Sequence, residues 1–123
     1  MRSLRRGQIF RLKSDSVGKK RPVLVVSPAK LNGGIYISAA PFYSQQLEKY
    51  RRHQSCVYFA AGEFGLDLDC VLKADEVSHY RISDLRTTEG EVGHVDPDRM
   101  RMVSDALCFA LGIEPHCEPI PES

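Results

Sequence analysis

Residues 18–28 read Gly-Lys-Lys-Arg-Pro-Val-Leu-Val-Val-Ser-Pro, a cationic turn that runs directly into a short apolar segment. Pro22 fixes its own φ and favours an extended backbone at the preceding residue. Four consecutive apolar residues at 23–26 predict a strand that is buried on both faces. The stretch therefore predicts a core strand with Arg21 held at its mouth.

A guanidinium held in this way has a defined chemical use. It is planar and always charged, so it can bind a phosphodiester and neutralise negative charge in a transition state. The alternative is that Lys19, Lys20 and Arg21 form an ordinary solvated turn.

Length and composition indicate one globular domain. The chain has 123 residues, of which 42% are hydrophobic and 27% charged, and its formal net charge is +1. We expect residues 1–113 to form a single domain and the Pro- and Glu-rich residues 114–123 to be a tail without regular structure. Because no apolar run reaches the ~18 residues of a membrane span and the first residues lack the apolar core of a signal peptide, we expect a cytoplasmic protein without a membrane partner.

Positive charge is clustered although the net charge is small. The clusters are Arg2, Arg5 and Arg6, then 19–21, then Lys49, Arg51 and Arg52. They form a basic groove only if the fold brings them together. The four cysteines show no C-x-x-C spacing, so we predict neither a metal site nor a cofactor.

The remaining pattern predicts short strands and one helix. Alternation or apolar runs predict strands at 7–12, 23–26, 35–40, 56–59, 70–77 and 91–95, with a possible bend in 70–77. Pro41 is expected to end the third strand, and residues 42–54 form a polar connection that could contain one helical turn. A short helical turn is expected at 81–85. Asp96 as N-cap, Pro97 at the first position and Gly112 at the end define the helix.

Five local sequences in this order resemble the MazF/PemK (Kid-like) toxins of bacterial toxin-antitoxin systems. They are Arg6–Phe10, the stretch from Gly18 through Arg21–Ser27, Ala40–Gln45, Val71–Val77 and the helix end at Leu107–Gly112. The resemblance implies a mainly β fold with a C-terminal helix, a small SH3-like or CcdB-like barrel. It also implies a homodimer, a cognate antitoxin, and metal-independent cleavage of single-stranded RNA at short motifs to 2′,3′-cyclic phosphate and 5′-hydroxyl ends.

The resemblance further implies site residues. The family's arginine before the proline corresponds to Arg21, and its hydroxyl residue, usually Thr, falls on Tyr43, with Ser44 next to it. Tyr43 is much longer than Thr, and Ser44 is displaced by one residue, so we favour Ser44 narrowly and keep both. Asp15 and Asp75 match family acids, with the structural alternatives of an exposed loop acid and a hydrogen-bonded carboxylate.

RNA binding is expected from basic and aromatic side chains near these positions. The expected RNA-binding residues are Lys19, Lys20, Lys49, Arg51, Arg52, His53 and Lys73. Tyr43, Tyr50 and His53 could stack on unpaired bases. Two other functions remain open. One is a CcdB-like toxin that acts by protein contact, against which the Arg-Pro element argues, and the other is a catalytically silent member that binds RNA or a protein.

Overall fold

The computed structural model describes residues 3–14 and 20–113, and within them seven strands form one antiparallel sheet. Hydrogen-bonded neighbours follow the order β4-β5-β3-β2-β1-β7, and β6 pairs with β3. The strands are β1 (Gln8–Arg11), β2 (Pro22–Val25), β3 (Tyr36–Tyr43), β4 (Cys56–Phe59), β5 (Cys70–Lys73), β6 (Ser78–Arg81) and β7 (Gly93–His94). The α-helices are α1 (Leu47–Tyr50) and α2 (Pro97–Leu111). Short 3-10 turns are η1 (Ala29–Leu31), η2 (Glu63–Gly65), η3 (Ala74–Glu76), η4 (Ile82–Asp84) and η5 (Thr87–Glu89).

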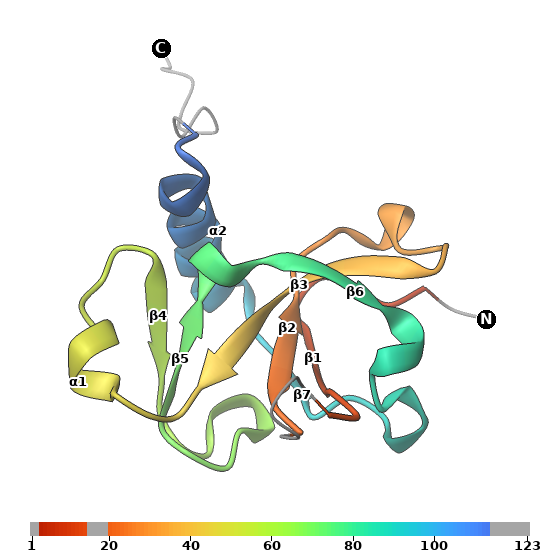
Figure 1. Ribbon diagram of the computed structural model, residues 1–123, viewed down its shortest axis with the longest axis horizontal. Helices are drawn as coiled ribbons and strands as arrows, with labels where there is room; N and C mark the ends of the chain where they lie inside the picture. The colour runs from red at the N-terminus through yellow and green to blue at the C-terminus, as the bar shows by residue number, and fades with distance from the viewer. Residues whose placement is uncertain (1–2, 15–19, 114–123) are drawn as a thin grey trace.

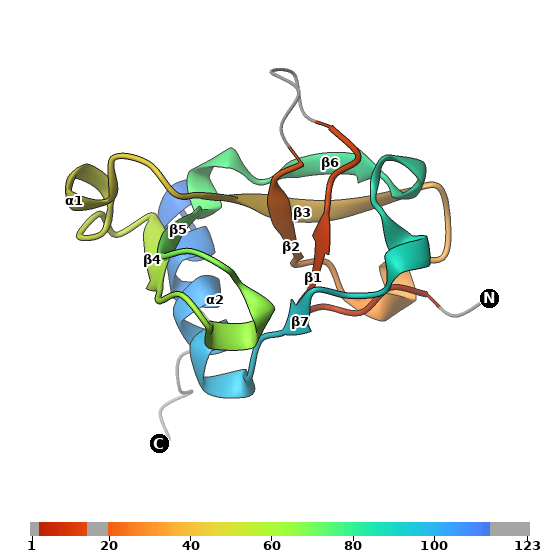
Figure 2. The ribbon, with the colours of Figure 1, turned by 90° about the horizontal axis from the view of Figure 1, so that it is seen from below.

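The sheet is strongly bent, and α2 lies alongside β4 and β5 (Figures 1 and 2). The architecture is a mainly antiparallel β half-barrel with a C-terminal helix, which confirms the predicted fold class. No helix among the described residues combines the length and the apolar character that a membrane crossing requires.

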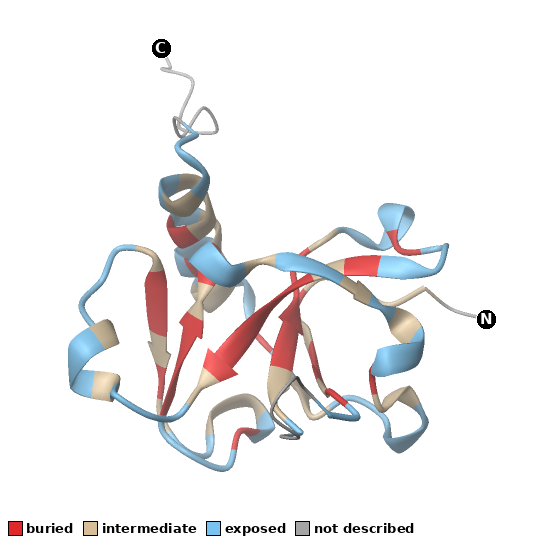
Figure 3. Cartoon of the chain, in the orientation of Figure 1, coloured by how far each residue is buried: buried red, intermediate tan, exposed pale blue. Residues whose placement is uncertain are grey.

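The central strands are buried on both faces, as the apolar run at 23–26 predicted (Figure 3). Leu24 and Val26 belong to the core beneath α2, together with Phe42 and Phe59. Val23 and Val25 point the other way, into a second cluster. The three residues of β2 after Pro22 are all buried, which makes the position of the strand in the sheet rigid, because protein interiors are close-packed.

Helix α2 begins and ends where the sequence predicted. The Asp96 carboxylate accepts a hydrogen bond from the backbone N–H of Arg99 at 2.8 Å, and Gly112 takes the left-handed conformation at the C-cap. Val103 and Ala106 are buried against the sheet. The Arg99 side chain contacts Glu63 in η2 at 2.8 Å, which fastens the start of the helix to the turn after β4.

The prediction that Pro41 ends the third strand was wrong. β3 continues to Tyr43, with Pro41 paired opposite Val23 of β2. The Ser38 carbonyl accepts from Val26, and alternate residues of an antiparallel strand face the same neighbour. The missing N–H of Pro41 therefore faces away from β2. On that side β3 pairs with β6 as far as Ala39 and with β5 beginning at Phe42, so Pro41 lies between the two partners. Proline costs no ladder hydrogen bond there.

The predicted strand at 70–77 bends, as its pattern allowed. β5 ends at Lys73, η3 follows, and β6 was not predicted from the sequence. This turn matters because it brings residues 73–76 beside the end of β3.

Candidate active site

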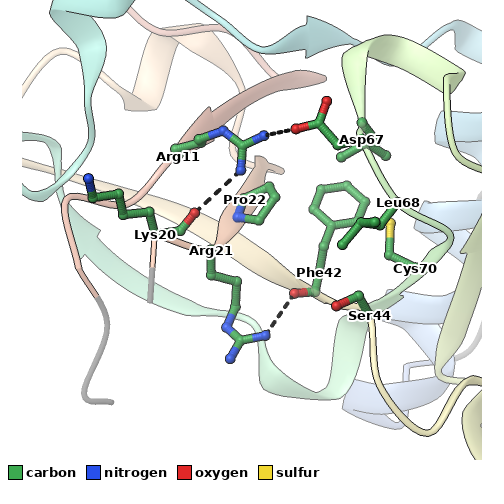
Figure 4. Close-up of a pocket in the computed structure, with 10 residues that line it drawn as sticks. Arg11, Lys20, Arg21, Pro22, Phe42, Ser44, Asp67, Leu68 and Cys70 are labelled. Atoms are coloured by element: carbon green, nitrogen blue, oxygen red, sulfur yellow. Dashed lines mark hydrogen bonds and ion pairs between the residues drawn. The ribbon is translucent and has the colours of Figure 1, made fainter. Parts of the chain in front are cut away.

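Arg21 is held at the start of β2 by two contacts to the end of β3. Its Nη1 donates to the carbonyl oxygen of Phe42 at 3.1 Å (Figure 4), and its guanidinium carbon lies 4.1 Å from the centroid of the Tyr43 ring. The strand register explains both contacts. Val23 pairs with Pro41, so the same register extended by two residues sets Arg21 opposite Tyr43. The structure thus confirms that Arg21 sits at the mouth of a buried strand.

A cleft of about 190 Å³ opens beside Arg21 (Figure 4). Its lining residues are Arg11, Lys20, Arg21, Pro22, Phe42, Ser44, Leu66, Asp67, Leu68 and Cys70. The exposed hydroxyl residue Ser44 directly follows β3. An ion pair between Arg11 and Asp67, at 2.9 Å, forms part of the wall. The cleft therefore combines a positioned arginine with a hydroxyl and partly apolar walls.

The hydroxyl of Tyr43 has a different partner. It donates to Oε1 of Glu76, and the Oε2 of the same carboxylate accepts from Lys73 Nζ at 3.0 Å. Burial, together with the nearby Glu76 carboxylate, raises the pKa of Tyr43 to about 12. Tyr43 is thus a neutral phenol at physiological pH.

Glu76 and Lys73 are both charged in this arrangement. Burial alone would raise the pKa of Glu76, but the hydrogen bonds from Tyr43 and Lys73 outweigh it and lower that pKa below its ordinary value. Burial alone would lower the pKa of Lys73, but its bond to Glu76 outweighs it and raises that pKa. A charge-assisted pair therefore borders the ring of Tyr43.

The side chain of Lys73 lies between the Tyr43–Glu76 pair and helix α1. Its Nζ lies 5.2 Å from the ring centroid of Tyr43 and 4.2 Å from that of Tyr50. Lys49 Nζ lies 5.2 Å from the Tyr50 centroid, and the His53 ring meets the Tyr50 ring edge-on at 5.8 Å. Cations and aromatic rings thus alternate from Arg21 to α1, which joins the second and third basic clusters of the sequence.

Other predicted residues lie elsewhere or outside the described part of the chain. Arg51 covers Tyr58 at 4.4 Å and pairs with Glu48, and Arg52 is exposed. Asp75 is exposed, and its neighbour Glu76 makes the bonds to Lys73 and Tyr43. Asp15 and Lys19 lie outside the described residues.

The first basic cluster has a structural role at Arg6. Its Nη1 donates to the carbonyl of Val26, and its Nη2 donates to Ser104 Oγ in α2 at 2.6 Å. Arg6 therefore ties the end of β2 to the helix. Among residues 3–14 and 20–113, no group of three or more His, Cys, Asp and Glu side chains is placed to hold a metal ion.

Sequence reasoning missed Glu76, Arg11 and Asp67. Arg11 was expected only as part of the strand at 7–12, and Asp67 was given no functional role. Glu76 lies three residues after Lys73 in the sequence, a spacing that pairs charges on a helical turn. The spacing would have indicated a Lys73–Glu76 pair only if residues 74–76 had been predicted as a helical turn.

Residues 5–111 match the family model described as PemK-like, MazF-like toxin of type II toxin-antitoxin system. No curated protein matches the sequence significantly.

Several solved structures share the fold at low sequence identity. An endoribonuclease in complex with its cognate antitoxin, from Mycobacterial species, has a TM-score of 0.72 at 23% identity and covers 91% of this chain and 98% of its own. The Mycobacterium tuberculosis toxin MazF-mt6 has a TM-score of 0.72 at 18% identity, with coverages of 87% and 98%. A MazE-MazF structure from Deinococcus radiodurans has a TM-score of 0.66 at 23% identity, with coverages of 91% and 99%.

Proposed function

The chain belongs to the PemK-like, MazF-like toxins of type II toxin-antitoxin systems, and from this premise we propose that it is a metal-independent endoribonuclease. Its substrate in this proposal is single-stranded RNA, cleaved at short sequence motifs to a 2′,3′-cyclic phosphate and a 5′-hydroxyl. The observation that carries the proposal is the placement of Arg21 at the mouth of β2, beside a cleft that Ser44 also lines.

The proposed reaction is a transesterification at phosphorus. The 2′-oxygen loses its proton and attacks the phosphorus, the P–O5′ bond breaks, and O5′ leaves with a proton. Negative charge grows on the non-bridging oxygens, and a guanidinium near them stabilises that charge. Arg21 takes this role, and the Ser44 hydroxyl donates one further hydrogen bond to the phosphate. Asp15 and Asp75 remain candidates for assisting proton transfer.

RNA follows the cations and aromatic rings that lead away from Arg21 in this proposal. Lys20 and Lys73 contact phosphates on either side of the reacting one, with Lys19 as a further candidate. Tyr50 and His53 present rings on which unpaired bases can stack, and Lys49, Arg51 and Arg52 add positive charge nearby. Such contacts support binding of a single strand because stacking does not require base pairing.

The proposed function includes two protein partners. We propose a homodimer and a cognate antitoxin whose binding blocks the Arg21 cleft. Exposed apolar side chains support protein contacts, because such surfaces are commonly covered by partners. They include Leu31, Ile35 and Tyr36 around the start of β3 and Met102, Phe109, Leu111 and Ile113 toward the end of the chain.

Metal independence is directly testable. Purified protein should cleave single-stranded RNA equally well in buffer and in excess EDTA, because side chains of the protein supply the positive charge. The assay follows fragments of a labelled RNA by gel electrophoresis, with a magnesium-dependent nuclease as the control that EDTA stops. Loss of cleavage in EDTA and its return on adding Mg²⁺ would contradict the proposed mechanism, and absence of cleavage in either buffer would favour a silent RNA or protein binder.

Substitutions at Ser44 and Tyr43 distinguish the roles of the two neighbouring hydroxyls. Ser44→Ala should slow single-turnover cleavage about tenfold, the loss of one transition-state hydrogen bond of ~1.4 kcal/mol, with little change in RNA affinity. Tyr43→Phe deletes a hydroxyl that contacts Glu76 rather than the cleft, so its loss of rate should match that of Glu76→Ala, which removes the same hydrogen bond. A loss in Tyr43→Phe that clearly exceeds the loss in Glu76→Ala, together with no loss in Ser44→Ala, would assign the phosphate contact to Tyr43.

A further inference from the structure

Four side chains from separate elements form a continuous series that ends at Arg21. Lys73 at the end of β5 pairs with Glu76 in η3 at 3.0 Å. The Glu76 carboxylate accepts the hydrogen bond of Tyr43, at the end of β3, and the Tyr43 ring lies under the Arg21 guanidinium at 4.1 Å. Each member contacts the next, and of the four only Arg21 lines the cleft proposed to hold the phosphate.

Arginine needs such support because its side chain is long. Its many rotamers carry conformational entropy that is lost when the side chain is held, and a displacement of about 1 Å at a reacting centre can lower a rate 100-fold. The bond to Phe42 fixes one nitrogen of Arg21. Stacking on Tyr43 fixes the plane of the guanidinium, provided that the ring itself does not turn.

The Tyr43 ring is fixed through its hydroxyl. The phenol remains protonated and the Glu76 carboxylate remains ionised at neutral pH, as their shifted pKa values indicate. A hydrogen bond from a neutral hydroxyl to a carboxylate is roughly twice as strong as one between neutral groups. Lys73 holds the other carboxylate oxygen, so the acceptor is itself anchored.

We propose that Glu76 is a positioning residue, which orients Arg21 for catalysis by holding the ring of Tyr43 with a hydrogen bond. The role in catalysis rests on the proposed function, whereas the orientation of Arg21 does not. In this arrangement the Tyr43 hydroxyl bonds to Glu76, and the Tyr43 ring contacts the guanidinium of Arg21. Glu76 acts without contacting the RNA.

The orientation can be measured without any enzymatic activity. A guanidinium stacked on an aromatic ring has side-chain proton resonances shifted upfield by the ring current. In the full-length protein, Glu76→Ala should move the Arg21 side-chain resonances toward their unstacked positions. Glu89→Ala is the matched control, because Glu89 also pairs with a cation three residues earlier in a 3-10 turn, Arg86 at 2.9 Å. Unchanged Arg21 resonances in folded Glu76→Ala protein would overturn the proposal.

Single-turnover kinetics then test the consequence for cleavage. Glu76→Ala should lower the rate about tenfold, with RNA affinity changed less than about twofold. Glu76→Gln, which still accepts the Tyr43 hydrogen bond, should stay within about threefold of wild type. An equal loss in both variants would instead make Glu76 a proton-transfer group and overturn positioning. If wild-type protein does not cleave RNA, the proposed function fails while the resonance shifts still decide the orientation.

Discussion

Arg21→Ala should lower the rate of RNA cleavage by about 100-fold to 1,000-fold while the protein stays folded. The expectation follows from removing the group proposed to stabilise charge on the phosphate, and the loss of one such donor commonly has this size. Arg21 is only partly buried and lies before β2, so its removal leaves the core intact. The measurement is single-turnover cleavage of a labelled RNA, with circular dichroism and thermal unfolding to verify the fold.

Two further variants sharpen this prediction. Arg21→Lys should recover only part of the activity, because an ammonium lacks the planar fork that binds two oxygens. Arg81→Ala is the matched control. Arg81 of β6 also lies over a tyrosine ring, 5.8 Å from the centroid of Tyr36, but it does not line the cleft. Near wild-type cleavage by folded Arg21→Ala protein would remove Arg21 from the mechanism.

Gly93→Ala should destabilise the fold by more than about 3 kcal/mol, which corresponds to a fall in Tm of about 10 °C or more. A Cβ at position 93 would lie 1.6 Å from the carbonyl oxygen of Phe64. The oxygen belongs to the backbone and the Cβ would be fixed to the Cα, so the clash can be relieved only by separating β7 from η2. Thermal and denaturant unfolding of the variant measure the cost.

A second glycine provides the control for this prediction. Gly34 has no atom within 4 Å of where a Cβ would stand, and its backbone is not among the positive-φ positions. Gly34→Ala should therefore change stability by less than about 1 kcal/mol. Equal unfolding midpoints for the two variants would show that the backbones of β7 and η2 are not in close contact at Gly93.

Much of the fold was predictable because it depends on local patterns. The apolar run at 23–26 predicted a strand buried on both faces, and Asp96, Pro97 and Gly112 predicted the limits of α2. Pro41 misled because its effect on a strand depends on which side the missing N–H faces. That side is set by strand partners, which local sequence does not specify.

The site was predictable only in part for the same physical reason. Arg21 could be placed at the mouth of a strand from Pro22 and the apolar run at 23–26. Its position over Tyr43 depends on the β2–β3 register. The pairing of Tyr43 with Glu76 requires both the contact of β3 with β5 and the turn after Lys73. Asp75 was named because it matches a family acid, and the rotation of the short turn that brings Glu76 to Tyr43 instead is not specified by local sequence.

The chemical nature of the RNA ends tests the central proposal most directly. Purified wild-type protein and Arg21→Ala protein would each be incubated with single-stranded RNA in EDTA, and the fragments identified by mass spectrometry. We expect 2′,3′-cyclic phosphate and 5′-hydroxyl ends with wild type and almost none with the variant. Fragments with 5′-phosphate ends, or the same cyclic ends at the same rate from folded Arg21→Ala protein, would contradict it.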